Sequence, residues 1–235
     1  MIIEDQVSWL PMFFKLFRPT FYLCEENSLL MAKMKIKEKK QIKYNAILEV
    51  SEKLMQLNGL HALNLDDVAK EAKMAKGTLY LYFKSKEEIL GALALKARKM
   101  LLAAFKENIS SKTSAIDKLK GVIEANYLFY KSNRLYYDLV SFYEISERET
   151  ETPQMQEVIR QITNLIVSII EEGQENEEIR KSIDPNVLSI SMWGMTVGVM
   201  QLLKVKAELI STHQALTEQK IIQNYTELFA IGIKK

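Results

Sequence analysis

From Lys37 onward the apolar residues recur at steps of three and four, which is the period of an α-helix. The first such apolar face comprises Ala46, Ile47, Val50, Leu54 and Leu57. No segment alternates apolar and polar residues for long enough to predict a strand. The 235 residues include only 8 Gly and 4 Pro, too few for many short strands joined by turns. The sequence therefore predicts an all-α fold.

Capping residues divide this pattern into separate helices. Gly59 follows the first helix, predicted over residues 38–58, as a C′ residue, and Asn64 is a good N-cap for the next. Ser85 with Glu88 forms a capping box, Asp184–Pro185 is an N-cap and N1 pair, and Thr217 caps the last helix. The later helices are predicted at residues 65–72, 75–82, 85–108, 114–131, 133–149, 153–180, 185–208 and 217–233.

Composition excludes several classes of protein. Apolar residues make up 48% of the chain and charged residues 26%, the balance of a soluble globular protein. The single cysteine, Cys24, excludes an internal disulfide and fits a reducing compartment. His61 and His213 lie far apart and lack any ligand spacing, so we expect no metal site and no cofactor.

Positive charge is concentrated in one early segment. Residues 33–86 contain twelve Lys and six acidic residues, whereas the whole chain has a formal net charge of only +2. A basic segment on a nearly neutral protein is a candidate contact for a polyanion such as DNA. A solvated, lysine-rich face is the alternative.

The first thirty residues follow a different pattern. Trp9 to Cys24 is apolar and aromatic, but it is too short to cross a membrane and is interrupted by Lys15 and Arg18. No basic region precedes it and no small-residue cleavage site follows it, so it does not resemble a signal peptide. It is either an appendage lying on a surface or membrane interface, or a result of a start site placed too early. We favour the second interpretation, with translation beginning at Met31 or Met34.

Two short helices joined by a tight turn occupy residues 65–84, which read LDDVAKEAKMAKGTLYLYFK. This is the pattern of a helix-turn-helix, in which the second helix enters the DNA major groove. Ala69 is small where the helices cross, and Val68, Met74 and Leu79 supply apolar contacts. Lys73 occupies the turn, where the backbone tends toward positive φ, at a cost of ~1 kcal/mol.

The stretch from Ile47 to Leu90 resembles the amino-terminal domain of the TetR family of transcriptional regulators. The run GTLYLYFKSKEE, from Gly77 to Glu88, carries most of the resemblance. The chain departs from the family pattern at Lys73–Met74, Ala75 and Asn64. The resemblance implies a three-helix DNA-binding domain at residues 33–86, followed by a larger effector-binding and dimerisation bundle at residues 87–235. Residues 1–32 form an extension outside both domains.

The resemblance and the chemistry of the side chains imply the same DNA contacts. The recognition helix presents Lys76 and Thr78 from its first turn, and Gly77 allows close approach of its backbone. Tyr80 and Tyr82 can donate hydrogen bonds from their hydroxyls to phosphates. Leu81 either contacts a thymine methyl or is an exposed side chain without a role in DNA binding. Lys86 and Asn64 are expected at phosphates, beside the amino ends of their helices. The Lys33–Lys43 arm would add salt-dependent, sequence-independent attraction.

The larger domain is expected to form a homodimer and to bind an effector. A two-fold dimer would read a pseudo-palindromic operator in double-stranded DNA. The last two long helices would form the interface, where Gly194 and Gly198 permit close approach; alternatively, these glycines accommodate a helix of the same subunit. The effector would be small and apolar or amphipathic. Candidate pocket residues are Asn126, Phe129, Tyr130, Tyr137, Phe142, Tyr143, Trp193 and Met200.

These features predict a sequence-specific regulator in the bacterial cytoplasm, most simply a repressor that an effector releases from its operator. Binding would be transmitted by the long helix at residues 85–108. An enzyme is not expected, because the sequence contains no phosphate loop, nucleophile–base pair or metal-ligand cluster. The alternative is a protein of the same fold without a small-molecule effector, controlled by a protein partner or acting architecturally. A closed apolar cavity of a few hundred Å³ would favour the effector.

Overall fold

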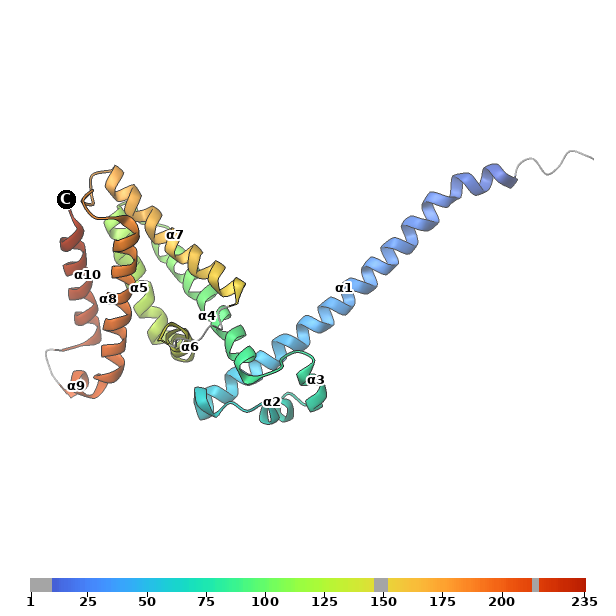
Figure 1. Ribbon diagram of the computed structural model, residues 1–235, viewed down its shortest axis with the longest axis horizontal. Helices are drawn as coiled ribbons and strands as arrows, with labels where there is room; N and C mark the ends of the chain where they lie inside the picture. Colours follow the sequence, from blue (N-terminus) through green and yellow to red (C-terminus); the bar gives the residue numbers. More distant parts are fainter. Residues whose placement is uncertain (1–9, 146–151, 213–215) are drawn as a thin grey trace, which may run out of the picture.

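The computed structural model describes the backbone of residues 10–145, 152–212 and 216–235, and it is all-helical there apart from a short 3₁₀ turn and one isolated bridge. Its amino-terminal unit contains α1 (Leu10–Asn58), η1 (Leu60–Ala62), α2 (Leu65–Glu71) and α3 (Lys76–Tyr80). α4 (Lys86–Ile109) connects this unit to a helical bundle (Figure 1). The bundle contains α5 (Ala115–Ser132), α6 (Arg134–Ile145), α7 (Pro153–Glu175), α8 (Pro185–Val205), α9 (Ala207–Thr212) and α10 (Glu218–Ile233).

The predicted caps form as expected. Asn64 accepts a hydrogen bond from the Asp66 N–H at 2.8 Å, and Ser85 accepts from Glu88 N at 3.4 Å. Glu88 reaches one residue further back than in a standard capping box, because its Oε2 accepts from Lys84 N. Gly59 follows the end of α1 with φ 85°, a positive value that glycine adopts without steric cost. Asp184 and Thr217 likewise accept from backbone N–H groups in the first turns of α8 and α10.

Helix α1 begins much earlier than predicted. The structure starts it at Leu10 rather than near residue 38, and it projects away from the rest of the molecule (Figure 1). Residues 31–43 are mostly Lys, Met, Glu and Gln, which favour helix without needing a core. Within this stretch the described side chains are exposed. The predicted basic arm is therefore a helical continuation of α1. Residues 1–9 of the proposed extension lie outside the described residues.

Three other helix boundaries were predicted wrongly. α7 ends at Glu175 instead of residue 180, because Glu177 turns the chain with φ 62° and lets Ile179 pack, fully buried, against Gly173. The helix predicted at residues 185–208 ends at Val205, and the separate α9 buries Ile210. α3 ends at Tyr80, two residues early, as Phe83 turns into the core. The predicted end of the helix at residues 133–149 lies outside the described residues.

Two apolar cores meet along α4. Its first half contributes Ile89 and Leu93 to the core of the amino-terminal unit, together with the buried Leu79 and Phe83. Its second half contributes to the bundle core, as with Phe105. α6 also belongs to both cores, because Leu139 and Tyr143 face the first and Tyr137 and Val140 face the second. A displacement of α4 or α6 would therefore disturb both units.

Candidate DNA interface and effector cavity

The turn between α2 and α3 has the geometry that a helix-turn-helix requires. Lys73 adopts φ 52°, as the sequence predicts, and the Met74 N–H donates to the Ala69 carbonyl at 3.0 Å. Ala69 is almost fully buried beneath the crossing helix. Leu79 of α3 is fully buried, so one side of this short helix is held in the core and the other faces outward.

The outward side of α3 carries the predicted DNA-contacting residues. Lys76 and Gly77 are exposed, and a methyl group added at Gly77 would meet nothing within 4 Å. Leu81 is 74% exposed at the end of the helix. Thr78, Tyr80 and Tyr82 are half-buried, because parts of their side chains pack on the domain. These residues form one surface that an incoming DNA groove could contact.

Lys76 forms an ion pair across the motif. Its ammonium lies 2.6 Å from Oδ1 of Asp66, which belongs to the first turn of α2. Both side chains remain more than half exposed. The hydrogen bond to Asp66 and the charge of its carboxylate raise the pKa of Lys76.

Two further predicted phosphate contacts have partners within the chain. The Lys86 ammonium donates to the His61 carbonyl at 2.6 Å, which ties α4 to η1. The Asn64 side chain accepts from the Asp66 N–H as the N-cap of α2. An ammonium has three donors, so Lys86 retains donors for another acceptor. For both residues DNA contact remains a prediction.

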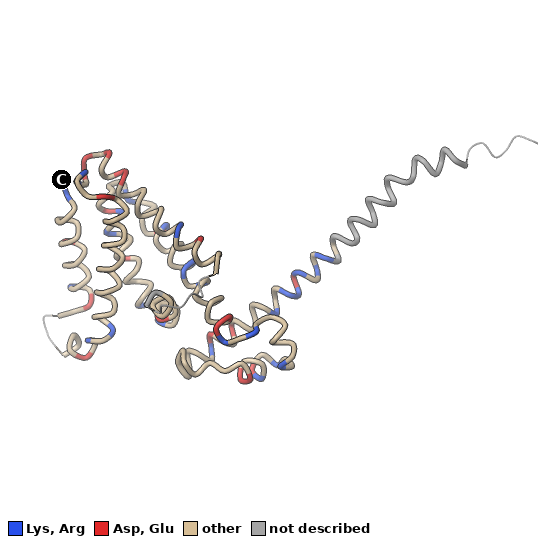
Figure 2. The backbone as a smooth tube through the Cα atoms, in the orientation of Figure 1, with Lys and Arg blue, Asp and Glu red and all other residues tan. Residues whose placement is uncertain are grey.

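The lysines of residues 33–43 lie along α1, on the segment that leaves the body of the protein (Figure 2). This segment is part of the straight helix that projects away from the body of the protein (Figure 1).

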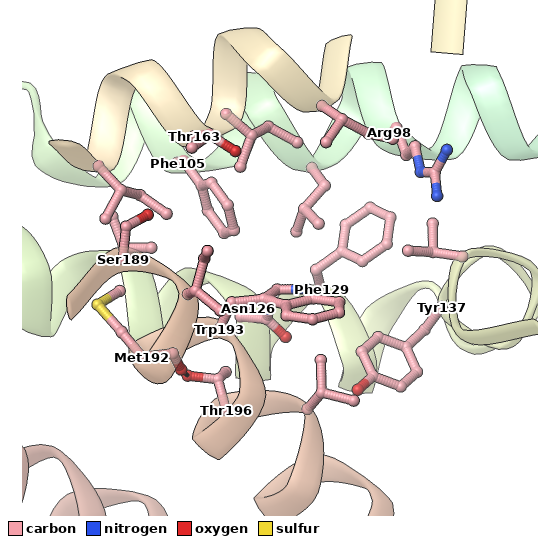
Figure 3. A pocket seen from close by; sticks show the side chains of 18 residues that line it. Arg98, Phe105, Asn126, Phe129, Tyr137, Thr163, Ser189, Met192, Trp193 and Thr196 are labelled. Carbon is pink, nitrogen blue, oxygen red and sulfur yellow. Dashed lines mark hydrogen bonds between the residues drawn. The ribbon is translucent and has the colours of Figure 1, made fainter. Parts of the chain in front are cut away.

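The bundle contains an apolar cavity of about 220 Å³ between α4, α5, α6, α7 and α8. Figure 3 shows the side chains of these helices converging on it. Its walls are mostly aliphatic and aromatic, and they include polar side chains from all five helices. The polar residues that line it are Arg98, Asn126, Tyr137, Thr163, Ser189 and Thr196.

Half of the predicted pocket residues line this cavity. Asn126, Phe129, Tyr137 and Trp193 are part of its walls. The other four lie elsewhere: Tyr130 and Met200 are buried in the bundle core, and Phe142 and Tyr143 lie against the amino-terminal unit. Phe142 packs edge-on against His61, and the Tyr143 hydroxyl donates to the Glu87 carbonyl at 3.4 Å. The presence of aromatic residues in the sequence therefore does not by itself show which of them line the cavity and which are buried in a core.

The sequence analysis missed Arg98, the one charged residue in the wall. It is only 3% exposed. A signal was present, because position 98 falls on the apolar face of α4 that also bears Ala94, Leu101 and Phe105. Asn126, which the sequence did predict, contributes a buried polar atom to the cavity wall. Its Oδ1 atom has no hydrogen-bond partner among the described residues. A buried acceptor without a donor is costly, so a ligand that donates there would be favoured.

A polar contact joins α4 to α1 and α6. Lys96 of α4 lies 2.6 Å from Glu52 of α1, and its ammonium sits 5.2 Å from the centre of the Tyr136 ring. Burial opposes the charge on Lys96, but its hydrogen bonds to Glu52 and Tyr136 outweigh this, so its pKa is raised. Tyr136 precedes the cavity residue Tyr137 in α6.

The outer face of α8 and α10 is apolar and contains three glycines. A methyl group added at Gly194, Gly198 or Gly232 would meet no atom within 4 Å. The alternative that Gly194 and Gly198 accommodate a helix of the same subunit is therefore wrong. The exposed apolar residues of α8, α9 and α10 are Val187, Ile190, Trp193, Met195, Leu202, Val205, Leu209, Leu228 and Ile231.

α8 also has the length and composition of a membrane-crossing helix, although a third of its most apolar stretch is buried in the bundle. It packs there against α7 and α5. No group of three or more potential metal ligands occurs in the part of the chain that the structure describes.

Comparison with known proteins agrees with this architecture. Residues 47–93 match the profile of the family described as bacterial regulatory proteins, tetR family. The chain is 26% identical over 185 residues to the fatty acid metabolism regulator protein of Bacillus subtilis, covering 77% of this chain and 95% of that one. It is 23% identical over 145 residues to the transcriptional repressor KstR2 of Mycolicibacterium smegmatis, covering 60% of this chain and 70% of that one.

A similar solved structure is that of the regulator FadR from Bacillus subtilis in complex with stearoyl-CoA. It has a TM-score of 0.63 and 23% identity, and the match covers 81% of this chain and 99% of that one. At this identity the likeness establishes the fold, not the ligand.

Proposed function

The chain belongs to the TetR family of bacterial transcription regulators, and we propose that it is a repressor that leaves its operator when a small amphipathic effector fills the cavity. The family consists of DNA-binding regulators rather than enzymes. The helix-turn-helix is accordingly the DNA-binding part of this protein. Which side chains contact DNA, what the effector is and how the protein assembles belong to the proposal.

In the proposed complex, α3 lies in the major groove. Lys76 and Thr78 contact base edges, and Gly77 lets the helix backbone approach them. Tyr80, Tyr82, Asn64 and Lys86 contact the phosphate backbone, and Leu81 contacts a thymine methyl. The exposure of Lys76, Gly77 and Leu81 on one side of α3 supports this assignment.

A homodimer would bring two such helices to a pseudo-palindromic operator. Supporting this, the outer face of α8 and α10 is apolar and exposed, and Gly194 and Gly198 leave space for a helix to approach closely. A water-exposed apolar face of this kind is typical of a protein–protein interface. We therefore place the second copy against α8 and α10, with the protein acting in the bacterial cytoplasm.

The observation that carries the proposal is the cavity and its α4 wall. A filled bundle would favour control by a protein partner, whereas a cavity of about 220 Å³ provides room for a small ligand. Arg98, Leu101 and Phe105 line it from α4, the helix whose first half packs in the core of the DNA-binding unit. An effector that favours a different position of α4 would therefore move α3 away from its DNA-binding geometry.

The names of the relatives support a repressor that responds to an amphipathic effector. One relative is named a repressor, and another was solved with stearoyl-CoA. A fatty acyl chain has the amphipathic character that an apolar cavity with a few polar groups would accept.

The test measures binding of purified protein to the intergenic DNA beside its own gene and to a random duplex, at two salt concentrations. We expect tighter, less salt-sensitive binding to the intergenic DNA. Lys76→Ala and Tyr82→Phe should weaken that binding more than tenfold, while the control Lys99→Ala, which removes an exposed charge from α4, should leave it within about twofold. Decanoic acid and stearoyl-CoA are then titrated into the complex.

Release of DNA by either probe supports the effector-controlled repressor. Specific DNA binding that neither these probes nor a wider panel of apolar compounds alters would favour the alternative, a regulator controlled by a protein partner. Equal and steeply salt-dependent binding to both duplexes would contradict sequence-specific recognition and favour an architectural role.

A further inference from the structure

The Asp66–Lys76 ion pair lies on the surface that the helix-turn-helix offers to DNA. It joins the first turn of α2 to the first turn of α3, with 2.6 Å between Oδ1 and Nζ. Both side chains are nearly 60% exposed, so the pair is not needed to compensate a buried charge. A surface ion pair of this kind contributes little to folding, so its position calls for another explanation.

A carboxylate beside DNA is unfavourable in itself, because it repels the phosphates. Asp66 and Asp67 both lie in the first turn of α2, where an acidic side chain favours the helix dipole. That benefit applies to both residues alike. Only Asp66 forms an ion pair with the recognition helix; among the described residues Asp67 has no such pair. The dipole therefore does not explain why the carboxylate at position 66 holds Lys76.

We propose that Asp66 is a specificity-determining residue, which positions Lys76 for a guanine of the operator and weakens its attraction to phosphates in general. The inference rests on the proposed role of Lys76 as a base-reading residue, and it assigns a role to a side chain that itself repels DNA.

The chemistry of the ammonium group supports the first half of this role. Lysine has a flexible four-carbon stem, and its charge is otherwise free to follow the nearest phosphate. Asp66 fixes the end of that stem at the amino end of α3. One of the three N–H donors is directed to Asp66, and the other two remain for acceptors. Guanine presents two acceptors, O6 and N7, side by side in the major groove.

Charge neutralisation supports the second half. An unpaired lysine that contacts a phosphate releases counterions from any DNA sequence and adds about 0.9 to the slope of log K against log salt. Pairing with Asp66 reduces this sequence-independent attraction. The affinity for the operator falls less than the affinity for random DNA, because operator binding also depends on the position in which Asp66 holds the Lys76 ammonium. The ratio of specific to non-specific affinity therefore increases.

The experiment compares Asp66→Asn with the matched control Asp67→Asn, which removes the same charge one residue away. Fluorescence anisotropy gives Kd for the operator and for a random duplex at several salt concentrations. For Asp66→Asn we expect tighter binding to random duplex, a salt slope steeper by up to about 1, and a specificity ratio about fivefold lower. Asp67→Asn should change both affinities by the same factor and preserve the ratio.

A double-variant comparison tests the mechanism. In a Lys76→Met background, Asp66→Asn should no longer change the specificity ratio, because its effect acts through Lys76. Circular dichroism checks that all variants keep the wild-type helix content; the cap on α2 is retained because Asn64 binds the backbone at position 66 rather than its side chain.

Equal changes in ratio for Asp66→Asn and Asp67→Asn, or an Asp66→Asn effect that persists with Met at position 76, would overturn the inference. If the wild-type protein discriminates and Asp66→Asn retains its ratio, only this inference fails. If the wild-type protein does not discriminate between the two duplexes, the proposed sequence-specific function fails, and the inference fails with it.

Discussion

The DNA-binding unit and the bundle differ in how their side chains are packed. The first buries a compact set of side chains, including Val68, Leu79 and Phe83, and the surface proposed to contact DNA is on its outside. The second contains a cavity of about 220 Å³ and leaves apolar side chains exposed on α8 and α10. A surface that reads DNA needs a fixed backbone, whereas a sensor needs room for a ligand and a partner. α4 contributes side chains to both cores, and we propose that it transmits the occupation of the cavity to the DNA-binding unit.

Four predictions test this contrast, and the largest concerns the outside of the bundle. Gly198→Arg places a charge on the apolar face of α8, at a position where an added Cβ atom would meet no atom within 4 Å. We expect it to weaken dimerisation by about 4 kcal/mol, because the charge is buried unpaired at the interface, while the subunit stays folded. Light scattering after size-exclusion chromatography measures the mass.

The control for that experiment is Leu81→Arg, which adds the same charge at an exposed apolar residue of the DNA-binding unit. It should remain dimeric. A dimeric Gly198→Arg protein would place the interface elsewhere.

The second prediction compares deletions in the two cores. Leu79→Ala removes a fully buried side chain from the filled unit and should cost about 3 kcal/mol in the free energy of unfolding. Ile162→Ala removes a half-buried side chain that already borders empty space, and should cost about 1 kcal/mol. Urea denaturation followed by circular dichroism measures both. Similar losses would mean that the two cores are equally well packed.

The third prediction compares substitutions that enlarge a side chain in each of the two cores. Val68→Phe adds volume to the filled unit and should cost about 2 kcal/mol through overpacking. Val122→Phe adds the same volume at the wall of the cavity, where we expect a cost below about 1 kcal/mol. Val122→Phe should also keep DNA binding but lose its response to effector. A Val122→Phe protein that responds normally would separate the cavity from the effector site.

The smallest expected effect is local to the helix-turn-helix. Lys73 adopts φ 52°, which glycine adopts without steric cost, so Lys73→Gly should stabilise the protein by up to about 1 kcal/mol. The gain is offset in part because glycine has more freedom in the unfolded chain. Thermal unfolding would detect a rise of a few degrees. A fall would show that the lysine side chain contributes contacts that exceed the strain.

The sequence predicted the DNA-binding unit well because its information is local. The N-cap at Asn64, the strained turn at Lys73 and the buried Leu79 all lie within sixteen residues of one another, and each follows from one-dimensional spacing. Two boundaries of this unit were predicted wrongly: α3 ends two residues earlier than predicted, and α1 begins at Leu10 rather than near residue 38. The unit's DNA contacts remain predictions, because the donors that reach a base are determined only when the DNA is bound.

The cavity could be predicted only in part, because its walls come from five helices distributed over most of the chain. Asn126 and Tyr137 line it, whereas Tyr130 and Tyr143, which look equivalent in sequence, face other neighbours. Helical periodicity predicts which face of each helix is apolar, but it does not predict which other helix packs against that face. The end of α7 was missed for the same reason, because Ile179 leaves the helix to meet Gly173 and Lys234.

The central claim is that occupation of the cavity and release of DNA are one equilibrium, and Trp193 can report on it directly. The sequence has two tryptophans, Trp9 and Trp193, and Trp193 lines the cavity. In a Trp9→Phe variant, decanoic acid or stearoyl-CoA is titrated into the DNA complex while tryptophan emission and DNA anisotropy are recorded together. The account predicts that both signals change with the same midpoint. A ligand that changes Trp193 emission to saturation while the DNA stays bound would contradict it.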